Sequence, residues 1–331
     1  MKIAVIGCGS IGRRHIGNLL VLGHEVIAWN RGDKRREFVA KNFDIPVYDN
    51  LDMMLNEVDL ESVVICSPNS FHLEHATKAI NKGLHLFIEK PIAITLEGLD
   101  EIAREANNRS LVSHVGANMR FHFGPASINK YIKSGKLGRP LWAHFWGGMH
   151  LPDWHPDEDY RQMYSASKVL GGGVVLDFIH EIDLIRWMFG DPLQLAAMVG
   201  KSGWLELETE DIADIIFAYP QGMQVSLHLD YLQRPFQRGI RVVGDKGWVQ
   251  WDLVKQTIEW FDHETREASI SEYPNGYEHN NMYIEQMKYF LTCIQNNEIS
   301  NSDISAGKSA LELALKIKQS AKNNKFIKGG V

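Results

Sequence analysis

The sequence has few cysteines, and their spacing fits neither a disulfide framework nor a metal site. Cys8, Cys66 and Cys293 are the only three in 331 residues, and none belongs to a Cys-x-x-Cys pair. A disulfide-stapled fold and a cysteine zinc site are therefore excluded. His150, Asp153 and His155 fit no standard metal spacing, so we expect no metal.

Long apolar runs and an excess of positive charge are also missing. No apolar stretch approaches the roughly 18 residues that a membrane span needs. The formal net charge is -6, which gives no basic field to attract nucleic acid. We therefore expect a cytoplasmic protein with neither a membrane nor a nucleic-acid partner. The length suits two domains of about 100–200 residues each.

The first third of the chain alternates short apolar runs with helical patterns. The runs lack a polar alternation, which is typical of parallel strands buried on both faces. We expect strands at 3–6, 25–29, 62–66, 84–88 and 111–116. Helices are predicted at about 11–22 and 71–82, each followed by glycine, and Thr95 is a plausible cap of a third helix. Repeated β-α-β units predict an α/β, doubly wound parallel sheet.

The pattern changes after about residue 118. In 224–231, Val225, Leu227, Leu229 and Tyr231 alternate with polar residues, which predicts an antiparallel strand with one buried face. Similar runs occur at 193–201, 211–219, 239–243 and 248–253, and helices are predicted near 281–296 and 305–322. We therefore expect domains at 1–118 and 119–331.

A glycine motif follows the first predicted strand and opens the first predicted helix. Gly7, Gly9 and Gly12 form a Gly-x-Gly-x-x-Gly pattern, with Ser10 and Ile11 inside it. In this context the motif predicts a dinucleotide site: Gly7 permits the tight turn, Gly9 lets the pyrophosphate approach, and Gly12 lets the helix pack on the sheet. The N–H groups at the helix start attract phosphate. The alternative is an ordinary tight turn.

The end of the second strand bears on the choice of cofactor. NAD enzymes usually carry an acid here that binds the ribose 2′-hydroxyl, but this chain has Asn30 followed by Arg31. An uncharged residue followed by arginine favours the 2′-phosphate of NADP slightly, and NAD stays open. Arg31 could instead stack on the adenine or face solvent.

Glu89-Lys90-Pro91 follows another predicted strand. Ligands of doubly wound folds bind beyond the carboxyl ends of the strands, so we expect Lys90 at the rim of the cofactor crevice. The proline restricts the backbone before it and permits a cis bond, which would aim Lys90 in one direction. There the lysine could hydrogen-bond the reacting hydroxyl or carbonyl.

These motifs together resemble the glucose–fructose oxidoreductase / inositol dehydrogenase / MocA family over nearly the whole chain. The matching residues are the GCGSIG motif, Pro68-Asn69 with His72, Glu89-Lys90-Pro91, and Gly171-Gly172-Gly173 followed by Asp177 and His180. The resemblance implies an N-terminal Rossmann domain, a C-terminal α+β domain with an open, mostly antiparallel sheet, and hydride transfer between NAD(P) and a carbohydrate. It also implies oligomer contacts through the free face of the C-terminal sheet.

The resemblance further implies roles for individual residues. Lys90, Asp177 and His180 would be catalytic, with His180 as the acid/base. The family's histidine usually comes four residues after the aspartate, whereas His180 comes three after Asp177, so Glu181 stays an alternative. The following set would contact the cofactor in addition to the glycine turn and Asn30-Arg31: Ser67, Pro68, Asn69, His72, Glu89, Lys90 and Arg120. Arg120 would also contact the substrate, or form an interdomain salt bridge.

Residues 150–173 read as a long loop that is rich in aromatic and polar side chains. Loops of this kind are often lids or binding segments, and Trp154 and Tyr160 suit stacking on sugar faces. Arg161 could engage a phosphate or carboxylate. We therefore expect these three residues to bind substrate with Lys90, Arg120, Asp177 and His180; the alternative is a dimer-contact loop.

The sequence predicts an NAD(P)-dependent oxidoreductase that acts on a sugar, polyol or nucleotide sugar, and that forms a homo-oligomer, either a dimer or a tetramer. Three alternatives stay open at this point. They are an NAD-dependent glycosidase that works by transient oxidation, a dinucleotide-sensing protein without turnover, and a reductase of non-sugar substrates on the same fold.

Overall fold

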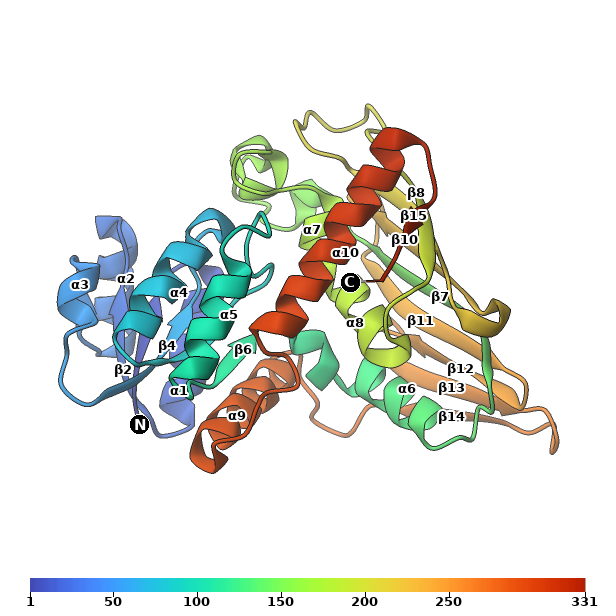
Figure 1. The fold of residues 1–331 in the computed structure, drawn as a ribbon, viewed down its shortest axis with the longest axis horizontal. Helices are drawn as coiled ribbons and strands as arrows, with labels where there is room; N and C mark the ends of the chain where they lie inside the picture. Colours follow the sequence, from blue (N-terminus) through green and yellow to red (C-terminus); the bar gives the residue numbers. More distant parts are fainter. Residues whose placement is uncertain (331) are drawn as a thin grey trace. The chain divides into compact units, whose positions relative to one another are not determined.

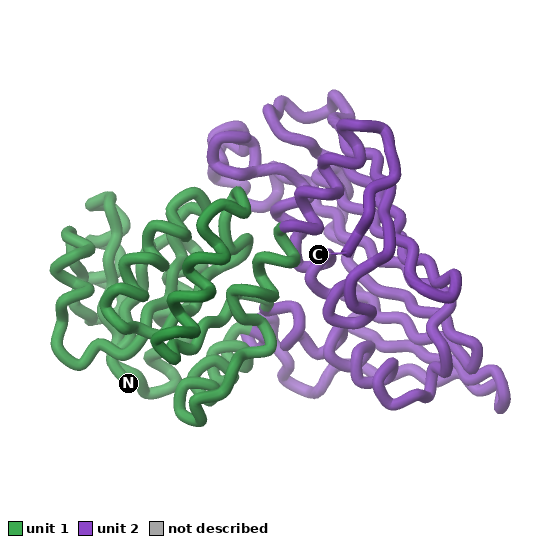
Figure 2. Tube along the Cα trace, in the orientation of Figure 1, with its two compact units in different colours: residues 1–117, 283–311 green, residues 118–282, 312–331 purple. Residues whose placement is uncertain are grey.

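The computed structural model describes residues 1–330, which form two compact units (Figure 2). Unit 1 contains 1–117 and 283–311, and unit 2 contains 118–282 and 312–330. Residues 283–311, which the sequence analysis places with the second predicted domain, pack with unit 1. The boundary in the last helix, α10 (Ile304–Asn323), lies within one continuous element.

Unit 1 contains a six-stranded sheet in the order β3-β2-β1-β4-β5-β6, with every pair parallel (Figure 1). The strands are β1 (Lys2–Ile6), β2 (Glu25–Trp29), β3 (Val47–Tyr48), β4 (Leu60–Ile65), β5 (His85–Ile88) and β6 (Ser113–Val115). The helices are α1 (Ser10–Val21), α2 (Asp33–Phe43), α3 (Leu51–Met54), α4 (His72–Asn81), α5 (Leu99–Asn108) and α9 (Asn281–Asn296). The predicted doubly wound parallel sheet is confirmed, and its strand order is that of dinucleotide-binding folds.

Unit 1 differs from the expectations at Thr95 and over residues 33–54, where α2, β3 and α3 were not predicted. Thr95 does not cap a helix: α5 begins at Leu99, directly after Gly98 with its φ of 79°. The chain bends through a left-handed residue there, which glycine adopts without steric cost. The pair α2 and β3 was not predicted, because α2 is rich in charge and buries only Val39, which leaves little apolar periodicity to detect.

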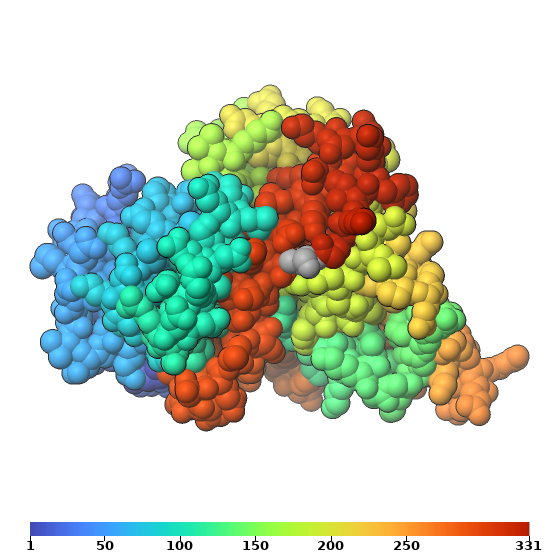
Figure 3. All heavy atoms as spheres, in the orientation of Figure 1, coloured from blue at the N-terminus to red at the C-terminus, as the bar shows by residue number. Residues whose placement is uncertain are grey.

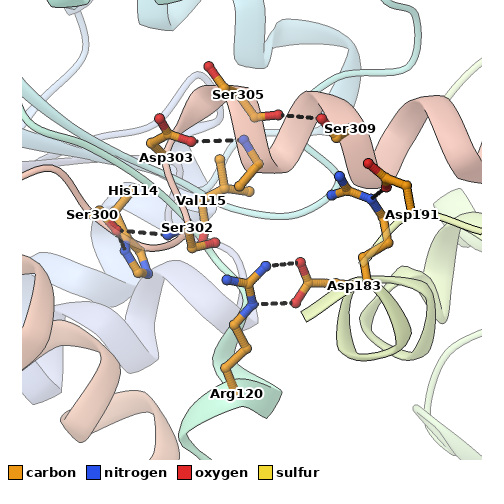
Figure 4. A network of polar contacts seen from close by, with 12 residues as sticks. His114, Val115, Arg120, Asp183, Asp191, Ser300, Ser302, Asp303, Ser305 and Ser309 are labelled. Atoms are coloured by element: carbon orange, nitrogen blue, oxygen red, sulfur yellow. Dashed lines mark hydrogen bonds and ion pairs between the residues drawn. The ribbon is translucent and has the colours of Figure 1, made fainter. Parts of the chain in front are cut away.

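A buried polar network joins residues 283–311 to β6. His114 lies 2.7 Å from the Ser300 hydroxyl (Figure 4) and 2.9 Å from the Gln286 amide. Ser302 donates its hydroxyl to the Val115 carbonyl and accepts the Val115 N–H through its own carbonyl. Buried polar groups need such partners, so this network specifies where the late segment docks. It explains why a segment far along the chain belongs to unit 1.

Unit 2 contains a nine-stranded sheet in the order β14-β13-β12-β11-β7-β10-β9-β8-β15. Its strands are β7 (Pro140–Gly148), β8 (Gln194–Gly200), β9 (Ile212–Ala218), β10 (Gln224–Asp230), β11 (Gln237–Gly244), β12 (Gly247–Asp252), β13 (Thr257–Asp262), β14 (Ala268–Glu272) and β15 (Ile327–Lys328). Its helices are α6 (Phe123–Lys133), α7 (Val174–Asp177) and α8 (Ile179–Phe189), with short turns of 3₁₀ helix at 118–121, 151–153, 160–162 and 164–166. The late part of α10 belongs to this unit, and its side chains lie on the face seen in Figure 3.

The predicted open, mostly antiparallel sheet is confirmed, with one exception. Strand β10 pairs antiparallel with β9 but parallel with β7, and the long connection between β7 and β10 permits this parallel pairing. The alternation read from the sequence holds: Val225, Leu227, Leu229 and Tyr231 are at most 1% exposed. The helices α6, α7 and α8 pack on that buried face.

Candidate functional site

The glycine turn lies at the carboxyl end of β1, and each glycine meets a different steric demand. Gly7 has a φ of 103°, and a Cβ there would lie 2.7 Å from the Cys66 carbonyl oxygen. A Cβ on Gly12 would overlap the Gly7 carbonyl, whereas Gly9 is open, with its nearest neighbour, an Arg35 nitrogen, at 3.9 Å. Of these three glycines, only Gly9 leaves open space beside its backbone, as a bound pyrophosphate requires.

The N-terminus of α1 leaves its N–H groups available for an anion. The helix begins at Ser10 and continues through Ile11, with Gly9 as the N-cap, and no side chain caps it. Its first turn has no acidic residue, so nothing in the turn opposes the partial positive charge of the helix end. This arrangement fits the phosphates of a dinucleotide.

The end of β2 carries Asn30 and a group of arginines. The Asn30 side chain accepts the Cys8 N–H at 3.0 Å and donates to the Gly32 carbonyl at 3.0 Å, so it fixes the glycine turn against β2. Arg31 is exposed, and its backbone carbonyl accepts a hydrogen bond from the Arg36 guanidinium. The positive charges of Arg35, Arg13 and Arg36 act on the turn and lower the pKa of the Cys8 thiol. Burial of the thiol has the larger effect and raises this pKa to about 11.

The loop after β4 holds Ser67, Pro68 and Asn69, and two histidines of α4 fasten it. The Ser67 hydroxyl lies 2.9 Å from Nδ1 of His75. His72 lies 2.8 Å from the Ser67 carbonyl and 2.9 Å from the Pro91 carbonyl. His72 is 1% exposed and has a carbonyl on each ring nitrogen, so its ring connects two loops within the protein.

Glu89-Lys90-Pro91 begins directly after β5, with a cis bond between Lys90 and Pro91. The Glu89 carboxylate accepts the Lys90 N–H at 3.2 Å and lies 2.8 Å from Nε2 of His15. Both His15 and Glu89 are buried. Strands β1, β4 and β5 are neighbours in a parallel sheet, so unit 1 brings the glycine turn, the 66–69 loop and Lys90 to one sheet edge.

In unit 2, Arg120 forms a buried double hydrogen bond with Asp183 of α8 (Figure 4). The two contacts measure 2.7 and 2.5 Å, and the side chains are 5% and 10% exposed. Paired donors on a carboxylate hold a guanidinium in one orientation. Arg120 therefore ties the 118–121 turn to α8.

Asp177 is the centre of a second buried cluster. Its Oδ2 accepts the Ser165 hydroxyl at 2.6 Å and the Tyr231 hydroxyl at 2.5 Å. The Trp154 ring meets the Tyr231 ring edge to face, with centroids 5.5 Å apart. Unit 2 thus brings the predicted residues Asp177 and Trp154 together through Tyr231, whose pKa burial and the Asp177 charge raise well above its usual value.

Sequence reasoning missed the roles of Tyr231 and Ser165. The alternation of β10 placed Tyr231 on the buried face, but it gave no reason to connect that residue with Asp177. A buried tyrosine hydroxyl usually finds a partner, and Asp177 is the partner in this fold.

His180 and Glu181 lie in the first turn of α8, directly after the Asp177 cluster. Glu181 forms an ion pair with Arg238 of β11, with 2.7 Å between Oε1 and Nε, and the two side chains are 2% and 12% exposed. The Arg238 guanidinium also lies over the Phe178 ring at 5.4 Å. The Glu181 carboxylate is therefore occupied by a fixed cation.

Two predicted substrate-binding residues of the 150–173 loop, Arg161 and Tyr160, contact protein groups inside and outside the loop. Arg161 pairs with Asp159 and with Glu206, and the Tyr160 hydroxyl accepts the Glu206 N–H at 3.3 Å. Asp153 pairs with Arg234, whose hydrogen bond lowers the pKa of Asp153 to about 2. Within residues 1–330, no group of three metal-binding side chains gathers, and no helix has the length and hydropathy to cross a bilayer.

Comparisons with known proteins agree with these observations. Residues 1–117 match the model of the oxidoreductase family with an NAD-binding Rossmann fold, and residues 126–250 match the GFO/IDH/MocA C-terminal domain. The chain is 24% identical to a myo-inositol 2-dehydrogenase of Thermotoga maritima, over 99% of this chain and 98% of the relative. It is 28% identical to an inositol 2-dehydrogenase of Ralstonia nicotianae, over 75% and 72% of the two chains.

Among solved structures, levoglucosan dehydrogenase in complex with NADH and levoglucosan has the same fold. Its TM-score is 0.90 at 17% identity, and the match covers 99% of each chain. The expected two-part fold and the expected oxidoreductase class are confirmed.

Proposed function

Because the chain belongs to the GFO/IDH/MocA oxidoreductase family, we propose that it moves a hydride between NAD(P) and a hydroxyl-bearing carbon of a polyol or sugar. The names of its relatives support this substrate class, since they designate dehydrogenases of inositol and of levoglucosan. The proposed substrate class includes nucleotide sugars.

One observation carries the proposal: the glycine turn and Lys90 lie at the same edge of the parallel sheet in unit 1. Gly9 is open to an approaching pyrophosphate, and the adjoining helix end has no acidic residue. Lys90 follows β5, two strands away from β1 in the sheet. A nicotinamide cofactor would supply the hydride chemistry, so the protein has to bind, orient and move a proton.

We assign the proton transfer to His180 of unit 2, and we assign to Lys90 of unit 1 a hydrogen bond with the reacting oxygen. His180 is preferred to Glu181 because Arg238 occupies the Glu181 carboxylate. Asp177 holds the Ser165 and Tyr231 hydroxyls directly before the helix that carries His180. Trp154, which packs on Tyr231, is assigned to the substrate ring; aromatic faces suit the apolar faces of sugars.

For the cofactor, the family description names NAD, and we propose that this chain prefers NADP. The end of β2 has no carboxylate to bind a ribose 2′-hydroxyl or to repel a phosphate, because Asn30 stands there. Arg13, Arg35 and Arg36 contribute positive charge near the turn. Guanidinium groups bind phosphate strongly, so this end suits a 2′-phosphate.

We also propose a homo-oligomer that forms through the uncovered face of the nine-stranded sheet. The exposed positions on this face include Trp142, Met198, Ile216 and Ile270, which are 39%, 80%, 52% and 67% exposed. Trp142, His144 and Trp146 stack along β7 on the same face. Apolar residues gathered on one face usually mark an interface.

The first experiment follows absorbance of reduced nicotinamide with NAD and NADP against inositols, sugars and nucleotide sugars. We expect one substrate class to reduce the cofactor, and Lys90→Ala to lower kcat by about 100-fold or more. Matched Tm and dinucleotide Kd values for the variant would exclude misfolding. Tight dinucleotide binding without reduction by any substrate would contradict the proposal and favour transient oxidation or a sensor.

A further inference from the structure

Lys90 lies between two residues that buried histidines hold in place. The residue before it, Glu89, contacts His15 of α1, and the residue after it, Pro91, contacts His72 of α4. His15 is 0% exposed and His72 is 1% exposed. The loop that carries Lys90 is therefore fastened on both sides, by two different helices.

The first fastening connects the loop to the helix of the glycine turn. Oε1 of Glu89 lies 2.8 Å from Nε2 of His15, and Oε2 accepts the Lys90 N–H at 3.2 Å. Gly116 makes room for this carboxylate, since a Cβ there would lie 2.9 Å from Oε2. One carboxylate thus joins the Lys90 backbone to the helix whose N-terminus faces the proposed phosphates.

The second fastening connects the loop to its neighbour after β4. His72 places Nδ1 2.9 Å from the Pro91 carbonyl and Nε2 2.8 Å from the Ser67 carbonyl. Burial lowers the pKa of His72, although both carbonyls oppose this effect. Each ring nitrogen of His72 thus lies within hydrogen-bond distance of a different carbonyl, so one side chain contacts both loops.

We propose that His15 and His72 are positioning residues, which fix the direction of Lys90 through Glu89 and Pro91. The inference rests on the proposed function, in which Lys90 hydrogen-bonds the reacting oxygen. A lysine side chain is flexible, so the position of its ammonium group depends on a backbone that does not move. Displacing a reacting group by about 1 Å can lower turnover by about 100-fold.

The test compares His15→Leu and His72→Leu with His15→Gln and His72→Gln. The glutamines keep an amide donor, so they should recover part of what the leucines lose. The matched control is His85→Leu, because His85 lies at the other end of β5 and only accepts the Val112 N–H. All variants are made in the full chain and compared at equal folded fraction.

Two measurements are made on each variant. Competitive acetylation across pH, read by mass spectrometry, reports the reactivity and the pKa of Lys90 without substrate. Steady-state kinetics and dinucleotide titration then separate kcat from cofactor Kd. We expect the leucine variants to change Lys90 labelling several-fold and to lower kcat by about 10- to 100-fold. Their dinucleotide Kd should change less than their kcat, and His85→Leu should match the parent in both readouts.

Unchanged Lys90 labelling in both leucine variants would overturn the inference, as would a loss of kcat that the unfolded fraction alone explains. The labelling does not depend on the reaction. If Lys90→Ala retains normal turnover, the role assigned to Lys90 in the proposed function fails, and the labelling still reports whether the two histidines hold the lysine.

Discussion

Glu181, which lies in the same helix turn as His180, forms an ion pair with Arg238 of β11, with 2.7 Å between Oε1 and Nε. A carboxylate held by a guanidinium is poorly suited to take and return protons, because the cation stabilises its charged form. The pair therefore separates two neighbours that the sequence alone leaves as alternative acid/base groups.

We expect Glu181→Gln to keep turnover within several-fold of the parent, because its carboxylate is not the acid/base. His180→Ala should lower kcat by about 100-fold or more, the usual contribution of a general acid/base. Breaking the buried pair should destabilise the chain by about 3–5 kcal/mol in urea unfolding. The reverse pattern, with Glu181→Gln inactive but stable, would move the proton transfer to Glu181.

Gly9→Ala and Gly7→Ala should fail in different ways. The Gly9 position is open, so Gly9→Ala should fold with nearly the parent Tm but lose dinucleotide affinity, because the methyl occupies the pyrophosphate approach. Gly7→Ala must place a Cβ 2.7 Å from the Cys66 carbonyl at a φ of 103°, so it should lose stability itself. Thermal unfolding with dinucleotide titration checks both, and normal affinity in Gly9→Ala would contradict the assigned site.

The elements predicted from the sequence are those whose pattern reflects burial. The strands β1, β4 and β5 read as apolar because helices cover both of their faces, and β10 alternates because helices cover only one. Charged α2 gave no such signal, since it buries a single residue. The parallel pairing of β10 with β7 was also not predicted, because the alternation of apolar residues shows which face is buried and not which strand lies alongside.

The candidate site could be predicted only in part for a similar reason. The glycine turn and Glu89-Lys90-Pro91 are local motifs, so their positions follow from neighbouring strands. Tyr231 and Asp177 are 54 residues apart, and only the fold brings them together. The pairing of Arg161 with Glu206, a residue 45 positions away, likewise comes only from the fold.

Asn30→Asp should shift the cofactor preference toward NAD. The new carboxylate keeps an acceptor for the Cys8 N–H, which Asn30 binds at 3.0 Å. It adds a negative charge that accepts a ribose 2′-hydroxyl and repels a 2′-phosphate. We expect the kcat/KM ratio of NADP to NAD to fall by about tenfold or more, a change of about 1.4 kcal/mol. An unchanged ratio, with the Tm preserved, would show that Asn30 does not face the ribose.

His228 should make stability fall as the solution becomes alkaline. It lies 3.2 Å from Asp230 and 2.7 Å from Asp214, and the hydrogen bond to Asp230 is the largest cause that raises its pKa to about 9. Because its pKa is raised in the folded chain, protonated His228 stabilises the fold fully at a pH below the ordinary pKa of 6.5. This stabilisation is lost as the pH rises through about 9. We expect Tm to fall between pH 7 and pH 10 in the parent and to vary less in His228→Gln. Equal slopes would remove this role.

Charge introduced on the uncovered sheet face should dissociate the proposed oligomer. Ile216 is 52% exposed at the middle of β9, and its neighbours Ala196 and Ser226 are small, so a carboxylate there fits the folded chain. In an interface it would be buried without a partner, which costs several kcal/mol. We expect Ile216→Asp to halve the mass measured by light scattering, or to reduce it to that of a single chain. Val58→Asp is the control, since Val58 is 74% exposed and belongs to unit 1, not to this sheet. If both variants keep the parent mass, the interface lies elsewhere; if the parent is itself a single chain, the proposed oligomer is overturned.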